Sequence, residues 1–535
     1  MTTSDAPPRS GLLRNASAMA LGTLISRVTG LVRLVVLAWA LGISSLSDVF
    51  NLSNNAPNTF YDLLIGGVLA STLIPVMVKA SSRVDRREAS EALSAIMTTG
   101  VAALLAATLV FELIAGLVIR GYMLGNHDPT RAIQLSAATN LLRLFAPQLF
   151  FYGAISLFTS LLNTRGRFAL PAFAPITNNI VAIVVLVAFR LLYGHLGTDG
   201  AISAMTHLSP SLLLLGVGTT FGVAIQCVVV VMGARRVGLT IGFNFDIFHP
   251  AVREIAKLSG WTFGYVLGNQ VSLYVLLALA DAHSPGSVSA YNNAYLFFQL
   301  PYGIAAYSVM AAIIPGLADN YAHGELGVFR RRFGRGLRAS VALLIPSAIA
   351  YLALGRQLVG ALLGHGAATT HGVDLTVGAL AGLAIGLPGF GIYLAMIQGL
   401  QSARLAKEVF WVYAVENGLT IILAVALVSS YGVVGLALAV SVSYSVAAVL
   451  AYWVMRGKRL APRLGPVLAS WLKFLLPSLA MAAAILLVSH HFAATGGARL
   501  FAKLVAELVA GGVAFGLLLW LEYAVSAMAG RRRMI

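Results

Sequence analysis

The sequence contains little charge and almost no cysteine. Only 10% of its 535 residues are charged and 59% are hydrophobic, whereas soluble domains have roughly 25% charged residues. A soluble globular enzyme is therefore excluded. The single cysteine, Cys227, has no partner for an intrachain disulfide or a cysteine metal site, so we expect it to be a packing residue. Walker, His-Glu-x-x-His and Cys-His patterns are absent from the sequence, so nothing indicates ATP use, zinc chemistry or an enzyme.

The mean hydropathy of +0.86 is spread along the whole chain rather than confined to one segment. Because a membrane span needs about 20 apolar residues, we expect an all-α polytopic membrane protein with about 14 transmembrane helices. The hydrophobic segments cover residues 12–42, 48–79, 91–119, 132–163, 169–192, 211–234, 252–281, 288–317, 337–355, 373–402, 408–430, 432–455, 470–489 and 503–528.

The net charge of +17 is explained by where the basic residues lie. Of the 36 Lys and Arg residues, 27 fall on alternate connections that begin with the N-terminus, and they include Arg330–Arg332, Arg335, Arg338 and Arg531–Arg533. The positive-inside rule then places both termini in the cytoplasm. We expect a multi-pass protein of the cytoplasmic membrane with anionic lipids as neighbours and no nucleic-acid partner.

Three arginines, Arg27, Arg33 and Arg143, fall inside predicted spans. A charge that faces lipid near the bilayer centre costs at least ~2.5–3.5 kcal/mol, so such residues usually face water or a carboxylate. Glu112 is a candidate structural partner for Arg143. Arg27 and Arg33 lie on one span, and we expect both to face a water-filled cavity.

The second span carries five polar residues at intervals of three and four, which places them on one helix face. These residues are Asp48, Asn51, Asn55, Asn58 and Asp62. A polar seam against another helix is one interpretation. Five polar groups exceed what one contact needs, so we favour a hydrated cavity that Arg27 and Arg33 also face, with Asp48 and Asp62 partly balancing them.

The chain also matches itself at an offset of 238. Asn54-Asn55-Ala56 aligns with Asn292-Asn293-Ala294, and the Ile-Pro pair at 74–75 aligns with the pair at 314–315 after a slip of two residues. Six spans separate the copies, so the halves have the same orientation and form two six-helix lobes related by a parallel repeat.

We therefore divide the chain into a disordered tail (1–11), an N-lobe with spans 1–6 (12–235), a C-lobe with spans 7–12 (236–460) and a C-terminal part with spans 13–14 and a basic tail (461–535). A substrate path lined by spans 1, 2, 7 and 8 is expected. Spans 7 and 8 contribute the polar residues Asn269, Gln270, Asn292, Asn293 and Gln299.

At this point several stretches resemble the MurJ/MviN lipid II flippases of the MOP exporter superfamily. They are residues 26–33 (SRVTGLVR), 47–50 (SDVF), 56–58 (APN), 162–171 (LNTRGRFALP), 300–303 (LPYG) and the Ile-Pro pair at 314–315. An arrangement of fourteen spans as two six-helix lobes and two additional helices also fits this family. The resemblance covers nearly the whole chain and implies alternating-access transfer of an undecaprenyl-pyrophosphate-linked peptidoglycan precursor across the membrane.

The resemblance also assigns residues. Arg27 and Arg33 match two cavity arginines of the family, and Asp48 matches its acidic residue at the start of span 2. Other positions depart from the family pattern, because Leu34, Tyr61, Asp62 and Leu296 stand where family members usually carry Asp or Arg. Two of four cavity arginines are therefore missing, which identifies a divergent member.

No cofactor is expected except a coupling ion. Tyr413, Glu416, Asn417 and Thr420 follow one another at helical spacing on span 11. Such oxygen-bearing groups are candidates for holding Na⁺ or carrying H⁺. Polar packing is the other interpretation of the same pattern.

Two further functions remain open at the level of sequence. A cation-coupled exporter of small molecules predicts an apolar or acidic cavity, which the paired arginines disfavour. A transport-inactive scaffold that binds cell-wall synthesis proteins would be consistent with the replaced family positions.

Overall fold

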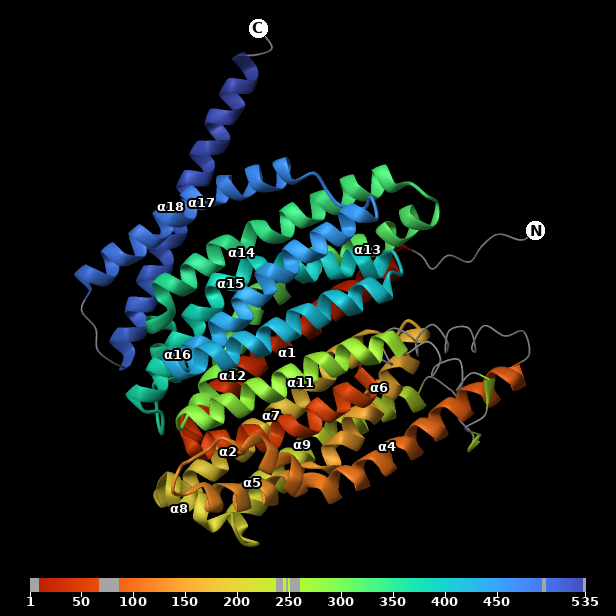
Figure 1. The fold of residues 1–535 in the computed structure, drawn as a ribbon, viewed down its shortest axis with the longest axis vertical. Coiled ribbons are helices and arrows are strands. Elements are labelled where there is room, and N and C mark those ends of the chain that lie inside the picture. The colour runs from red at the N-terminus through yellow and green to blue at the C-terminus, as the bar shows by residue number, and fades with distance from the viewer. Residues whose placement is uncertain are drawn as a thin grey trace. The chain divides into compact units, whose positions relative to one another are not determined.

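The computed structural model describes residues 9–66, 86–236, 244–246, 249–250, 260–492 and 497–532, and the regular elements in those ranges are all helical (Figure 1). Contacts divide the chain into two compact units, Met1–Gln270 and Val271–Ile535. The boundary falls within helix α11 (Gly260–His283). The all-α fold predicted from hydropathy is confirmed.

The first unit contains ten further helical elements among the described residues. They are α1 (Arg9–Leu41), α2 (Ser45–Tyr61), the π-helical turn η1 (Asp62–Gly66), α4 (Arg86–Tyr122), α5 (Arg131–Phe145), α6 (Pro147–Thr164), α7 (Ala169–Tyr193) with the 3₁₀ turn η3 (Gly194–Leu196), α8 (Gly197–Ala204) and α9 (Pro210–Arg235). The second unit contains α12 (Ser287–Pro301), the π-helical turn η4 (Tyr302–Ala306), α13 (Tyr307–Ala322), α14 (Leu326–Leu363), α15 (Thr370–Ser402), α16 (Ala406–Gly457), α17 (Leu464–His491) and α18 (Gly497–Arg532).

Helix α7 is the central contact of the first unit, because α1 and α9 both pack against it. A Cβ atom at Gly218 of α9 would collide with Val185 of α7, and one at Gly222 would collide with Asn178. The two glycines therefore allow the close helix approach that small residues give in membranes. Cys227, also on α9, is buried as predicted.

Helix α15 plays the same part in the second unit, where it packs against α12, α14 and α16. Gly382 and Gly386 of α15 lie against Ala437 and Ser441 of α16, and the Ser441 hydroxyl donates to the Gly382 carbonyl at 2.7 Å. Helix α16 is broken at Gly432, where φ is 55°. Glycine adopts this left-handed conformation without the steric penalty that other residues have.

The helices match the predicted spans. Within the described residues, 11 helices are long and apolar enough to cross a membrane, and the bent pair of α12 and α13 raises this to 12. This number takes α16 as one span although Gly432 breaks it, and it omits α2, whose predicted span continues past the described residues. Each of the fourteen predicted segments therefore has a helix in the structure.

The outer surfaces of these helices are apolar. Leu109, Leu113 and Leu117 form a stripe on α4 and are 67%, 85% and 70% exposed. Residues four apart share a helix face, and such a stripe would be costly in water but suits lipid tails. The stripe supports assignment of α4 as a span that contacts lipid.

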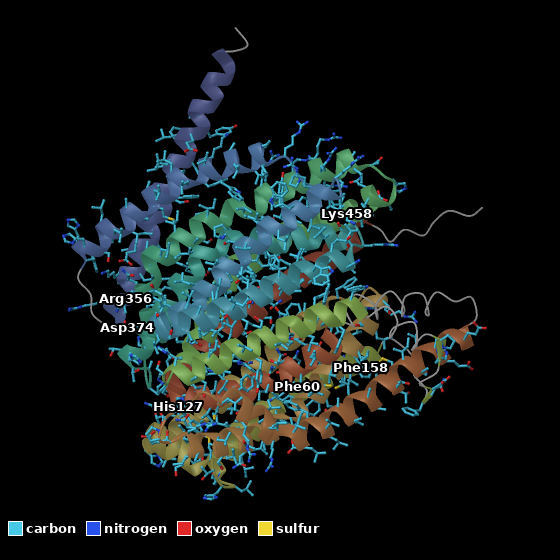
Figure 2. All side chains as sticks on the ribbon, viewed as in Figure 1. Phe60, His127, Phe158, Arg356, Asp374 and Lys458 are labelled. Atoms are coloured by element: carbon cyan, nitrogen blue, oxygen red, sulfur yellow. The ribbon has the colours of Figure 1, made fainter. Side chains whose placement is uncertain are left out.

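Two ion pairs mark the two polar ends of the helices in the second unit. Arg356 of α14 forms an ion pair with Asp374 of α15 at 2.9 Å, and Lys458 forms one with Glu408 at 2.6 Å. Figure 2 shows Arg356 and Asp374 at one end of the unit and Lys458 at the other. The alternation of basic residues along the sequence puts Lys458 on the side of the N-terminus and Arg356 on the opposite side of the membrane, and the arrangement within the unit is consistent with this.

Candidate functional site

Two helices in the chain continue into the same kind of wide turn. Helix α2 contains Pro57 and continues into η1 at Asp62, and α12 ends at Pro301 and continues into η4 at Tyr302. The offset between the turns is 240 (from 62 to 302), which is the repeat offset with its two-residue slip. A π-helical turn inserts an extra residue into the helix and is frequent at functional sites. The local backbone therefore follows the internal repeat.

The first residue of each wide turn is bonded to a glutamine. The Gln270 side-chain amide donates to Asp62 Oδ2 at 3.2 Å, and the Gln398 amide donates to the Tyr302 hydroxyl at 3.2 Å. Gln270 is buried, and its own carbonyl oxygen has no hydrogen-bond partner among the described residues. Each turn is thus fixed by one hydrogen bond to a residue far away in the sequence.

The predicted polar face of α2 changes in character along the helix. Asp48 and Asn51 are buried, Asn55 and Asp62 are half-buried, and Asn58 is exposed. The five side chains therefore share a face, as the spacing predicts, but only its C-terminal part is accessible. Asp48 and Asn51 each have an interaction partner, which suits a structural role at the start of the helix.

The two arginines of α1 differ in exposure. Arg27 is exposed and Arg33 is half-buried. Asn179 of α7 fixes the backbone beside Arg27, because its amide donates to the Ser26 carbonyl at 3.2 Å and to the Thr29 hydroxyl at 3.0 Å. In the described part of the chain neither arginine forms an ion pair, and the expected partial balance of Arg27 and Arg33 by Asp48 and Asp62 stays a prediction. Asp62 accepts a hydrogen bond from a neutral amide instead.

A tyrosine lies between the opposite charges of α1 and η1. Arg33 and Asp62 both act electrostatically on the hydroxyl of Tyr152, a residue of α6. The ring of Tyr61 lies against that of Tyr152, with centroids 5.9 Å apart. The structure thus brings Arg33, Tyr61, Asp62 and Gln270 to one region of the first unit around Tyr152.

The polar residues of α11 and α12 have separate surroundings. Asn269 is exposed. Asn293 is buried, Asn292 and Gln299 are half-buried, and the amide nitrogens of both asparagines have no hydrogen-bond partner in the described ranges. An unpaired buried amide costs free energy, so these two nitrogens are available to a ligand or to water.

The span-11 residues form a second cluster, in the second unit. Glu416 is buried and accepts a hydrogen bond from the Thr420 hydroxyl at 3.1 Å, while the Asn417 amide donates to the Tyr413 carbonyl at 2.8 Å. Three tyrosines interact electrostatically with Glu416, namely the buried Tyr291 and Tyr393 and the half-buried Tyr444. No group of three or more His, Cys, Asp or Glu side chains suited to a metal ion exists among the described residues.

Sequence reasoning missed the tyrosines of both clusters. Tyr152, Tyr393 and Tyr444 lie in strongly apolar segments, where an aromatic residue is most simply explained as core. Their position near a carboxylate depends on contacts between α2 and α6, and between α15 and α16. Arg143 was better predicted, because Glu112 does act on it electrostatically.

Comparison with known families gives a match over most of the chain. The family described as Lipid II flippase MurJ matches residues 37–507. A lipid II flippase MurJ of Burkholderia cenocepacia is 27% identical over 388 residues, which are 71% of this chain and 72% of the relative. A probable lipid II flippase MurJ of Thermotoga maritima is 25% identical over 432 residues, 81% of this chain and 83% of the relative.

Solved structures show the same fold. One titled lipid II flippase MurJ in an inward closed conformation has a TM-score of 0.76 at 20% identity and covers 95% of this chain and 99% of that one. An inward-facing multidrug resistance MATE transporter of the MOP superfamily has a TM-score of 0.64 at 12% identity and covers 82% and 98%. At these identities the likeness concerns the fold alone.

Proposed function

Because the chain belongs to the lipid II flippase MurJ family, we propose that it flips a polyprenyl-pyrophosphate-linked peptidoglycan precursor, lipid II, across the cytoplasmic membrane by alternating access. The family match over residues 37–507 is the observation that carries this proposal. The helical membrane fold supports it. The polar groups of α1, α2 and η1 give it a chemical basis.

Arg27 and Arg33 bind the pyrophosphate in this proposal. A pyrophosphate brings about two negative charges into a region of low dielectric, and guanidinium groups bind such oxygens in bidentate fashion without losing their charge. Arg27 is exposed and Arg33 half-buried, and no carboxylate in the described ranges is paired with either. Both guanidinium groups can therefore take an anionic ligand without first breaking an ion pair.

Asp62 acts against this binding. Its carboxylate interacts, through Tyr152, with the same region as Arg33, and it is held by Gln270. A negative group close to the arginines lowers their affinity for a pyrophosphate. In a transporter such a group favours release, because a substrate bound too tightly is not delivered.

Glu416, Asn417 and Thr420 are the candidates for the coupling ion. The site offers one buried carboxylate and hydroxyl and amide oxygens around it, which are hard ligands suited to Na⁺. The same carboxylate can carry H⁺, since acids buried in spans commonly serve proton relays. Either ion gives the transporter an energy source that needs no nucleotide.

The protein is placed in the cytoplasmic membrane with both termini in the cytoplasm. The alternation of basic residues along the sequence supports this orientation. Enzymes that make lipid II on the inner face and those that polymerise it on the outer face are the partners this orientation would serve.

Complementation of a bacterium depleted of its own lipid II flippase tests the proposed function. Growth and precursor movement should be restored by the wild-type chain and by Arg120→Ala, which removes an exposed arginine at the end of α4. Purified protein in proteoliposomes should flip fluorescent lipid II. Growth without flipping would instead support the scaffold, and export of cationic dyes without flipping would support the exporter.

A further inference from the structure

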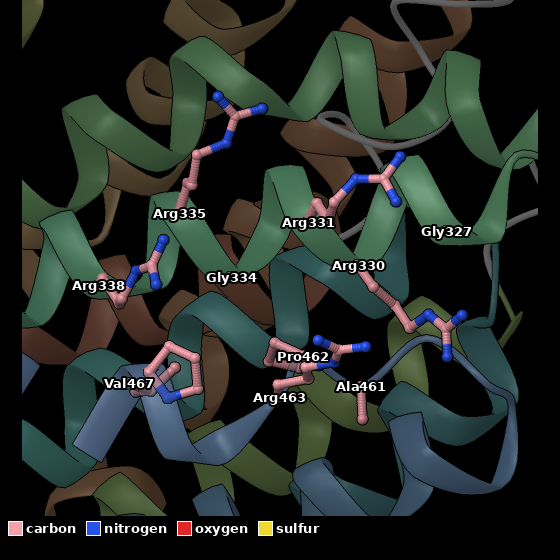
Figure 3. A pocket seen from close by; sticks show the side chains of 11 residues that line it. Gly327, Arg330, Arg331, Gly334, Arg335, Arg338, Ala461, Pro462, Arg463 and Val467 are labelled. Atoms are coloured by element: carbon pink, nitrogen blue, oxygen red, sulfur yellow. The ribbon is translucent and has the colours of Figure 1, made fainter. Parts of the chain in front are cut away.

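A cavity of about 450 Å³ lies at one end of the second unit and is lined by five arginines. Arg330, Arg331, Arg335 and Arg338 come from the first turns of α14, and Arg463 comes from the connection between α16 and α17. Figure 3 shows Arg330 extending on the side of Pro462 and Arg463, and Arg331 and Arg335 extending away from them. This volume is within the range of small-ligand sites.

One wall of the cavity is set by a close contact between α14 and the α16–α17 connection, although four of the five arginines are exposed. A Cβ atom at Gly334 of α14 would lie only 3.1 Å from Pro462, so glycine lets the connection approach the helix. The connection is fixed in turn by Arg459, whose φ is 60°, and by hydrogen bonds from the Leu460 and Ala461 amides to the Met455 carbonyl. Arg463 is thereby held opposite the arginines of α14.

The charges in the cavity are not balanced by the protein. No Asp or Glu lines it, and none of the five guanidinium groups forms an ion pair or hydrogen bond with another described residue. Neighbouring cations behave differently, because Lys458 pairs with Glu408 at 2.6 Å and Arg332 donates to Asn320 at 3.2 Å. Five like charges around one hollow repel one another, and an anion would relieve that repulsion.

The surroundings indicate where the anion comes from. The helices α14 and α17 both begin at this cavity and continue as membrane spans. Val328, Leu464 and Leu468, which lie in the first turns of these helices, are exposed. Apolar side chains beside the arginines would suit acyl chains, whereas a free phosphate would gain nothing from them.

We propose that this cavity binds the phosphate-bearing headgroup of an anionic phospholipid. The guanidinium groups take the phosphate oxygens, and the exposed apolar residues contact the lipid tails. Bound lipid then holds α14 to the α16–α17 connection at the membrane surface. The proposal does not depend on which substrate the protein transports.

Native mass spectrometry tests this with the full-length protein and added lipid. Wild-type protein should retain cardiolipin or phosphatidylglycerol, and the variant Arg331→Gln/Arg335→Gln/Arg463→Gln should retain at least about tenfold less, since it removes three of the guanidinium groups that line the cavity and would bind the phosphate. The matched control, Arg235→Gln/Arg236→Gln/Lys407→Gln, removes three exposed cations outside the cavity and should behave as wild type. Equal retention by the triple variant, or an equal loss in the control, would overturn the proposal.

A second arm separates the lipid from a soluble anion. Inorganic pyrophosphate at millimolar concentration should leave most of the lipid bound, and phosphatidylcholine should not be retained. Displacement of the lipid by pyrophosphate with the same affinity would assign the site to free phosphate. Retention of phosphatidylcholine at the level of phosphatidylglycerol would show that the arginines are not involved. Unchanged thermal unfolding of lipid-free triple variant establishes that any loss of lipid is not a loss of fold.

Discussion

Asp62 and Tyr302 occupy equivalent positions in the two halves of the chain, yet only Asp62 carries a charge. Each is the first residue of a π-helical turn, and each accepts a hydrogen bond of 3.2 Å from a glutamine amide. The repeat has therefore kept the backbone turn and the type of donor while the acceptor changed. A carboxylate in only one half makes the two halves electrostatically different.

Removal of that charge should strengthen precursor binding. Asp62→Asn keeps an oxygen that accepts from Gln270 but removes the negative charge that opposes a pyrophosphate. We expect tighter binding by up to ~1–3 kcal/mol, the usual size of coupling energies, together with slower turnover. The measurement is a lipid II titration of wild type and variant.

The structure offers a matched control for this change. Tyr302→Phe removes the equivalent hydrogen bond to Gln398 without changing charge, so it should leave the affinity for lipid II unaltered. Weaker binding by Asp62→Asn would mean that Asp62 serves a cationic ligand. That result would support a cation-coupled exporter instead of a lipid II flippase.

Replacement of either α1 arginine should abolish translocation and leave the protein in the membrane. Arg27 is exposed and Arg33 half-buried, so Ala at either position removes an anion contact with little loss of packing. Arg→Lys should restore little activity, because an ammonium group cannot bind phosphate oxygens in bidentate fashion. The assay is lipid II flipping in proteoliposomes, with Arg120→Ala as the control; wild-type rates in both Ala variants would remove the pyrophosphate role.

Glu416→Gln should uncouple transport from its driving ion. The buried carboxylate is the one charge in its cluster, and Gln preserves its size and its hydrogen bond with Thr420. Flipping by wild type should depend on an imposed Na⁺ or H⁺ gradient, and the variant should lose that dependence. Glu408→Gln is the control, because Glu408 pairs with Lys458 at the end of the helix. A variant that still responds to both gradients would assign Glu416 to packing.

The stability of the C-terminal helices should depend on a buried ion pair. Glu507 of α18 is fully buried; it lies 3.9 Å from Lys503 and accepts from Gln357 of α14 at 3.3 Å. Lys503→Met leaves the carboxylate without a positive partner, and loss of one partner of a buried pair costs about 3–5 kcal/mol. Thermal unfolding in detergent should show a lower midpoint.

A double variant tests whether the unpaired charge of Glu507 causes the loss of stability. The double change Lys503→Met/Glu507→Leu removes both charges and should recover most of the stability, because apolar residues of similar volume replace a buried pair well. A double variant as unstable as the single one would show that the loss came from packing against α14 and not from the unpaired charge.

The sequence predicts what depends on local spacing. The intervals among Asp48, Asn55 and Asp62 follow from helix geometry and place them on one face, as the structure has them. The partner of Asp62 does not follow, because Gln270 lies on another helix and neither residue has a local pattern that points to the other. Charge complementarity suggested an arginine instead, and a neutral amide occupies that place.

Clusters that combine distant segments were also out of reach. The positive-inside rule alone accounts for Arg330, Arg331 and Arg335 in the sequence, because it predicts the side of the membrane on which they lie. The sequence alone therefore offers no reason to expect a cavity there. Only the position of Pro462 and Arg463 beside Gly334 turns the basic run into a cavity. By contrast, the break at Gly432 was predicted, because the hydrophobic segments 408–430 and 432–455 are divided at this point of the sequence.

The wide turn η4 takes up one residue more than an α-helical turn without changing the phase of α13. One residue deleted within Tyr302–Ala306 would therefore give an ordinary α-helix and leave α13 in nearly its present phase. Met310 and Leu317, which are fully buried, would stay in the core, whereas a residue deleted from α13 itself would rotate everything after it by about 100°. The turn is thus the place in this helix pair where a change in length by one residue is tolerated.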